Sequence, residues 1–125
     1  MTAAHVCLLV AAVLPPLCAL IAKAGRFGFK ENHDPRAWQA RQTGWRARAL
    51  AAQANGFEAL PLFIGGLLVA WQREAAPATV DLLAMSFVGL RVVYIGLYLA
   101  DLATLRSVAW IGAVGCAVAL YFTGG

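Results

Sequence analysis

The chain is short of charged residues, since only 13% of its 125 residues are Asp, Glu, Lys or Arg. An average soluble domain has about 25% charged and roughly 45–50% apolar residues, whereas this chain is 62% hydrophobic. The low charge argues against a disordered chain. It also argues against a nucleic-acid-binding domain, because that requires a basic face on a folded surface. The composition therefore indicates a membrane protein with no nucleic-acid partner.

Residues for metal or covalent chemistry are also scarce. The three cysteines, Cys7, Cys18 and Cys116, show no paired spacing and no clustered histidine, so we expect buried thiols, no disulfide framework and no metal site. His5 and His33 are isolated, and we assign them to an interface or a loop. The sequence has no glycine-rich phosphate loop and no G-x-S-x-G nucleophile motif.

Four long apolar stretches are present, and each is long enough to cross a bilayer as a helix. They predict an all-α fold, a four-helix transmembrane bundle that forms one domain over residues 1–125. The expected helices cover about 5–22, 46–72, 79–100 and 107–123. A secretory signal is the alternative for the first stretch, but no Lys or Arg precedes it.

The basic residues are concentrated in one connection. Seven of the ten cations lie between the first apolar stretch and the body of the second: Lys23, Arg26, Lys30, Arg36, Arg41, Arg46 and Arg48. The positive-inside rule therefore predicts a cytoplasmic first connection and both termini on the non-cytoplasmic side. The segment is a topology determinant, and its cations also suit contact with anionic lipid headgroups.

Polar side chains recur inside the second and third predicted helices. On the second helix they are Arg48, Gln53, Asn55 and Glu58, and on the third they are Arg91, Tyr94, Tyr98 and Asp101. At about 100° per residue, Arg48 and Asn55 point in nearly the same direction and Glu58 lies roughly 60° away. The third-helix residues recur at intervals of three and four, which also places them on one face. We expect the two stripes to face each other or a ligand.

The predicted depth of two charged residues in the membrane supports this expectation. Glu58 and Arg91 lie near the middle of their helices, where a charged side chain costs about 2.5–3.5 kcal/mol. We therefore predict that they are paired, directly or through a polar bridge. A simple ion pair that fixes helix register is the alternative, but it leaves Asn55, Tyr94 and Tyr98 unexplained. A pocket in the cytoplasmic half would suit a small anionic ligand brought against an apolar one.

Two segments carry a resemblance to a known family. RARALAAQANGFEALPLF (residues 46–63) and RVVYIGLYLADLATLRS (residues 91–107) resemble the second and third helices of the MAPEG family, membrane-associated proteins in eicosanoid and glutathione metabolism. The four spans and the basic first connection match as well. That family includes microsomal glutathione transferases, leukotriene synthases and prostaglandin E synthases, and this compact chain is most similar to its bacterial members.

The resemblance implies a function and a site. It implies a glutathione-dependent transferase or peroxidase acting on a lipophilic electrophile, with glutathione as co-substrate, in a homotrimer of the bacterial inner membrane. Arg106 and Tyr94 would be catalytic, with Arg106 beside the sulfur. Glutathione would be bound by residues of the second and third helices: Arg48, Gln53, Asn55, Glu58, Arg91 and Tyr98.

One departure keeps other functions open. Ala51 stands where several enzymes of the family carry an arginine that grips glutathione. Either Arg48 compensates one turn earlier, or glutathione is not the ligand. A non-catalytic ligand-binding or scaffold protein is thus one alternative. A small proton-coupled exporter is another, suggested by the intramembrane Glu58.

Overall fold

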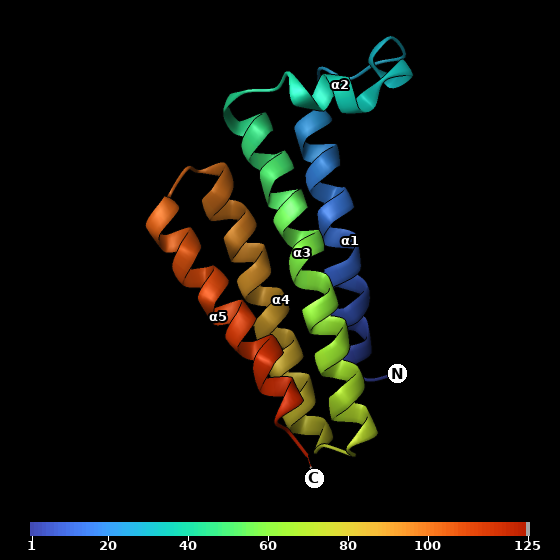
Figure 1. The fold of residues 1–125 in the computed structure, drawn as a ribbon, viewed down its shortest axis with the longest axis vertical. Coiled ribbons are helices and arrows are strands. Elements are labelled where there is room, and N and C mark those ends of the chain that lie inside the picture. Colours follow the sequence, from blue (N-terminus) through green and yellow to red (C-terminus); the bar gives the residue numbers. More distant parts are fainter. Residues whose placement is uncertain (125) are drawn as a thin grey trace.

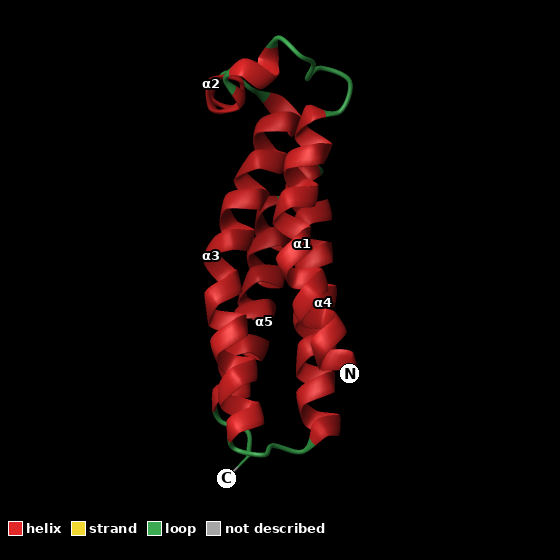
Figure 2. Cartoon of the chain, turned by 90° about the vertical axis from the view of Figure 1, so that its right-hand side faces the viewer, coloured by secondary structure: helices red, strands yellow, loops and turns green. Residues whose placement is uncertain are grey.

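The computed structural model describes residues 1–124, and within them the chain is helical, with no strand (Figures 1 and 2). The elements are α1 (Ala3–Lys23), the short 3-10 helix η1 (Glu31–His33), α2 (Pro35–Ala40), α3 (Gly44–Gln72), α4 (Pro77–Leu99) and α5 (Ala103–Tyr121). The all-α prediction is confirmed, and the four long helices begin and end within a few residues of the expected positions.

The four long helices form one bundle with α3 and α4 at its centre. Both α1 and α5 pack against α3 and α4, which also contact each other. Figure 1 shows the two chain ends at one end of the bundle and α2 lying across the other. The expectation that both termini lie on one side of the membrane agrees with this arrangement.

The packing of the bundle relies on small residues around a few large ones. Phe63 of α3 and Phe87 of α4 stack with ring centroids 4.0 Å apart, and both are fully buried. At Gly66 a Cβ atom would lie 2.8 Å from the backbone oxygen of Ala117, so only glycine allows this approach of α3 and α5. Small residues at helix contacts are the usual way in which membrane helices gain close packing.

All four long helices are apolar enough to cross a membrane. Their mean hydropathies over an 18-residue window are 2.3, 1.3, 1.9 and 1.6. Large apolar side chains such as Leu9, Leu82 and Ile111 are exposed on the outside of the bundle, where lipid tails can cover them. The chain is a multi-pass membrane protein.

Two consecutive prolines lie inside α1. We expect Pro15 and Pro16 to kink or unwind the helix, because proline has no backbone N–H and its ring crowds the preceding turn. The helix is continuous from Ala3 to Lys23, so no unwinding occurs. The prolines still remove the usual donors for the carbonyl groups four residues earlier.

The first connection is a folded cap, defined as residues 24–43, and not an open loop. Asp34 accepts a hydrogen bond from the backbone N–H of Ala37 at 3.2 Å and begins α2, with Pro35 in the first turn. Trp38 is buried and meets the Phe27 ring edge-on at 5.1 Å. Tryptophans near helix ends commonly lie at the membrane interface, but this one holds the cap together.

The predicted cytoplasmic position of the cap can be tested by labelling. A cysteine introduced at the exposed Thr43 should resist an impermeant thiol reagent in intact cells, because the basic residues around it are retained inside. A cysteine at the exposed Ala76, in the connection at the opposite end, is the matched control and should react. Labelling at position 43 with protection at position 76 would reverse the topology.

Candidate functional site

A polar pocket of about 180 Å³ opens between α3, α4 and α5, toward the end of the bundle that carries the cap. Its wall combines one cation, one amide, three hydroxyl groups and one indole. The lining residues are Asn55 of α3, Tyr94 and Tyr98 of α4, and Arg106, Ser107 and Trp110 of α5. The structure thus brings together four residues that the sequence assigned to the site from separate helices.

On one side of this pocket, arginine side chains pack against tyrosine rings. The guanidinium carbon of Arg91 lies 4.2 Å from the Tyr94 ring centroid, and that of Arg106 lies 4.3 Å from the Tyr98 centroid. Between them the two tyrosine rings meet edge-on at 5.6 Å. Cation–π attraction of this kind holds each guanidinium against its ring. Arg106 is therefore positioned at the pocket wall by Tyr98.

Arg91 lies behind the pocket and does not line it. Only 3% of its surface is exposed, and its Nη1 donates a hydrogen bond to Asn55 Oδ1 at 2.8 Å. This bond uses the carbonyl oxygen of the Asn55 amide, which leaves the amide nitrogen as a donor for a ligand. Arg91 thus orients Asn55 from behind.

The predicted pairing of Glu58 with Arg91 is wrong for the described residues. Arg91 bonds Asn55 instead, and the Glu58 side chain is exposed on the surface of the bundle. The register ion pair considered as an alternative is absent for the same reason. Glu58 lies three residues beyond Asn55, about 60° around α3, and this rotation carries it away from α4. It lines a groove of about 150 Å³ between α3 and α5.

Two other sequence candidates lie outside the pocket. Arg48 donates to the backbone oxygen of Leu99 through Nε at 3.3 Å and Nη2 at 3.2 Å. It therefore satisfies a carbonyl at the end of α4, where a cation also favours the helix dipole. Gln53 is half-buried on α3 and does not line the pocket.

Trp110 and Ser107 are pocket residues that the sequence reasoning missed. Trp110 lies near the start of the last predicted helix, a position that is typical of a tryptophan at the membrane interface. Its spacing of four from Arg106 was the available signal, because residues four apart share a helix face. Trp110 and Asn55 line both the polar pocket and the neighbouring groove, so they stand where the two meet.

The sequence of this four-helix bundle matches a known protein family. The model of the MAPEG family matches residues 3–125, nearly the whole chain. The chain belongs to the MAPEG family. No curated protein and no solved structure matches it. The resemblance seen in residues 46–63 and 91–107 is therefore confirmed at the level of the family.

The pocket of this MAPEG protein suits an anion. Its lining has the guanidinium of Arg106 and the hydroxyl groups of Tyr94, Tyr98 and Ser107, and it includes no carboxylate. A guanidinium attracts carboxylates and thiolates, and the hydroxyls and the Asn55 amide supply directed hydrogen bonds.

Proposed function

We propose that this MAPEG protein is an integral membrane enzyme that uses glutathione as co-substrate, in a transferase or peroxidase reaction on a lipophilic electrophile. One observation carries the proposal: Arg106, Asn55, Tyr94 and Tyr98 line a single pocket near the end of the bundle that carries the cap. Glutathione is polar and anionic, and the pocket offers a cation with hydrogen-bonding groups around it.

Arg106 provides a chemical function in this proposal. The nucleophile is the thiolate, while a free thiol has a pKa of about 8.5 and is mostly protonated at neutral pH. A guanidinium beside the sulfur stabilises the anion and raises its population. In this proposal the Tyr94 hydroxyl donates a hydrogen bond to the same sulfur, and Asn55 holds the peptide. In conjugation with an aryl halide the thiolate sulfur bonds to the electrophilic carbon, the carbon–halogen bond breaks and halide leaves. In peroxide reduction two glutathione molecules form a disulfide as the peroxide becomes alcohol and water.

The groove beside the pocket suits the lipophilic partner. Its wall includes the apolar side chains of Ala59, Leu62 and Val114. Because it shares Asn55 and Trp110 with the polar pocket, an apolar molecule that enters from the bilayer would meet a bound thiolate beside Trp110.

A homotrimer completes the site in this proposal. The pocket of about 180 Å³ is smaller than the roughly 300–1,000 Å³ of typical ligand sites. Exposed Glu58 lies near the middle of α3, where a carboxylate facing lipid is costly. A second copy against α3 would cover Glu58 and supply the missing wall. Native mass spectrometry from lipid should give three copies, and a glutathione-binding monomer would contradict the assembly.

Two alternative functions are a non-catalytic ligand-binding protein and a small proton-coupled exporter. Ala51 favours a non-catalytic ligand-binding member, because no arginine stands at that position to grip glutathione. An exporter would need a proton-binding carboxylate that is not paired with a cation, and Arg91 bonds Asn55 and not Glu58. Proton-carrying carboxylates normally face the interior of a bundle, whereas Glu58 is exposed on the outside of the protomer.

Turnover in lipid vesicles tests the enzyme proposal. The reconstituted protein should consume glutathione in the presence of a lipophilic aryl halide or lipid hydroperoxide, and Asn55→Ala should lose most of this activity through weaker binding. Arg36→Ala, which removes an exposed cation from the cap, is the matched control and should keep it. Glutathione binding without turnover on either class would favour the non-catalytic member.

A further inference from the structure

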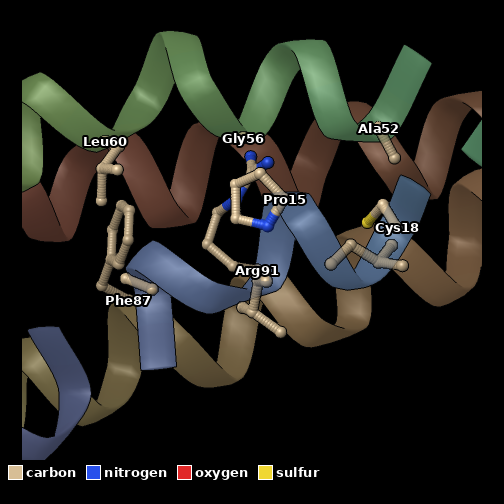
Figure 3. A pocket seen from close by; sticks show the side chains of 10 residues that line it. Pro15, Cys18, Ala52, Gly56, Leu60, Phe87 and Arg91 are labelled. Atoms are coloured by element: carbon tan, nitrogen blue, oxygen red, sulfur yellow. The ribbon is translucent and has the colours of Figure 1, made fainter. Parts of the chain in front are cut away.

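A second cavity lies on the other side of Arg91, where α1 packs against α3 and α4. It has a volume of about 10 Å³ and is lined by residues that include Pro15, Cys18, Gly56, Phe87 and Arg91. Figure 3 shows the nitrogen atoms of Arg91 beside Gly56 of α3 and the Pro15 ring of α1. None of its lining residues lines the polar pocket. This space is about what the centre of one water molecule needs.

A charged donor without a partner faces this cavity. Arg91 Nη2 is buried and makes no hydrogen bond, although Nη1 is satisfied by Asn55. Nη2 lies 3.7 Å from the position that a Cβ atom on Gly56 would occupy, so it points into the α1–α3 contact. A buried guanidinium donor left unsatisfied costs more than a neutral one, which makes the site strongly favourable for an acceptor.

The prolines of α1 supply a matching acceptor. In an α-helix the carbonyl of Ala11 normally receives the N–H of residue 15, and the carbonyl of Ala12 receives the N–H of residue 16. Both positions are proline and have no N–H. Ala11 is buried and lines the cavity. Because residues four apart lie on one helix face, the carbonyl of Ala11 is on the side of α1 that carries Pro15.

We propose that one water molecule occupies this cavity, accepts a hydrogen bond from Arg91 Nη2 and donates one to the Ala11 carbonyl oxygen. Buried waters typically make about three hydrogen bonds, and Cys18 Sγ is available as a weak third partner. The water joins α1 to α4 at a depth where the bilayer supplies no other solvent.

Pro15 is then a positioning residue for the polar pocket. By removing the N–H of residue 15 it frees the Ala11 carbonyl, the water links this carbonyl to Arg91, and Arg91 orients Asn55. This chain of contacts does not depend on the identity of the ligand. It also gives the paired prolines different roles, because Pro15 is buried at the cavity and Pro16 is exposed on the outside of the helix.

A structure of the protein in lipid, at a resolution that shows single waters, tests the site directly. We expect a density peak within hydrogen-bond distance of both Arg91 Nη2 and the Ala11 oxygen. A closed cavity in which Nη2 bonds directly to a protein acceptor would overturn the proposal.

Matched proline variants separate this role from helix stiffness. Pro15→Ala restores an N–H that captures the Ala11 carbonyl, so the peak should be lost from the Ala11 oxygen and the NMR order parameter of the Arg91 side chain should fall. Pro16→Ala restores an N–H whose usual acceptor is the carbonyl of Ala12, a residue that does not line the cavity, so it should preserve both. Equal behaviour of the two variants, or an unchanged peak in Pro15→Ala, would show that the Ala11 carbonyl is not the partner. Neither measurement requires glutathione, so failure here is distinct from failure of the proposed function.

Discussion

Replacing Arg106 with alanine should lower the thiolate-to-thiol ratio of bound glutathione roughly tenfold to hundredfold. A hydrogen bond from a charged group is worth about 1.5–3 kcal/mol, and one pKa unit corresponds to about 1.4 kcal/mol. The loss should appear as a raised pKa of the bound thiol, so the thiolate now forms only at higher pH. Asn55 and the tyrosines remain, and therefore binding should largely survive. Titration of the bound thiol by ultraviolet absorbance measures the change.

Two variants complete this experiment. Asn55→Ala should show the opposite pattern, with weaker affinity and a smaller change in the thiol titration, because Asn55 is assigned to the peptide. Arg41→Ala removes an exposed cation of the cap and should change neither. If the thiol pKa in Arg106→Ala matches that of the unmodified protein, Arg106 is an anchor at the membrane surface and another group activates the sulfur.

Asn55→Leu should lower the free energy of unfolding by about 1.5–3 kcal/mol, because it leaves Nη1 of the buried Arg91 without its acceptor. Arg91→Met should also destabilise by stranding the Asn55 amide. The double variant removes both partners together, so it should be more stable than the sum of the single effects predicts. Unfolding in mixed micelles measures all four proteins.

The control is a second double-mutant cycle, in which Glu58 replaces Asn55 as the partner of Arg91. Glu58→Gln and Arg91→Met should be additive, because Glu58 is exposed and Arg91 bonds elsewhere. Additivity in the Asn55 cycle combined with coupling in the Glu58 cycle would restore the ion pair expected from the sequence and contradict the contact seen in the structure.

Hydropathy was sufficient to predict the long helices, because a segment that spans the membrane must satisfy its own backbone hydrogen bonds over a known length. It missed α2, which has only six residues. The local signal was available in Asp34 followed by Pro35, a typical helix start. A short helix in a polar segment has no apolar run, however, so hydropathy gives no sign of it.

Helix periodicity predicted which residues share a face, but not how the faces meet. Asn55 and Glu58 are both on the stripe of α3, yet only Asn55 contacts Arg91. Their side chains point about 60° apart around the axis of α3. This angle is small enough to leave both residues on one face of α3, but large enough that only one of them contacts Arg91 of α4. The rotation of α3 within the bundle depends on close approaches such as that to α1, where a Cβ on Gly56 would lie 2.9 Å from Pro15 Cγ. Packing of this kind cannot be inferred from spacing alone.

Calorimetry of the purified protein with glutathione, followed by ultraviolet absorbance of the bound thiol, tests the central claim most directly. The account predicts saturable binding and a thiolate signal at neutral pH, where free glutathione is mostly protonated. Binding should weaken in Asn55→Ala, and the thiolate signal should fall in Arg106→Ala. An absence of binding, or a bound thiol that titrates like the free one, would contradict a glutathione-activating site in this pocket.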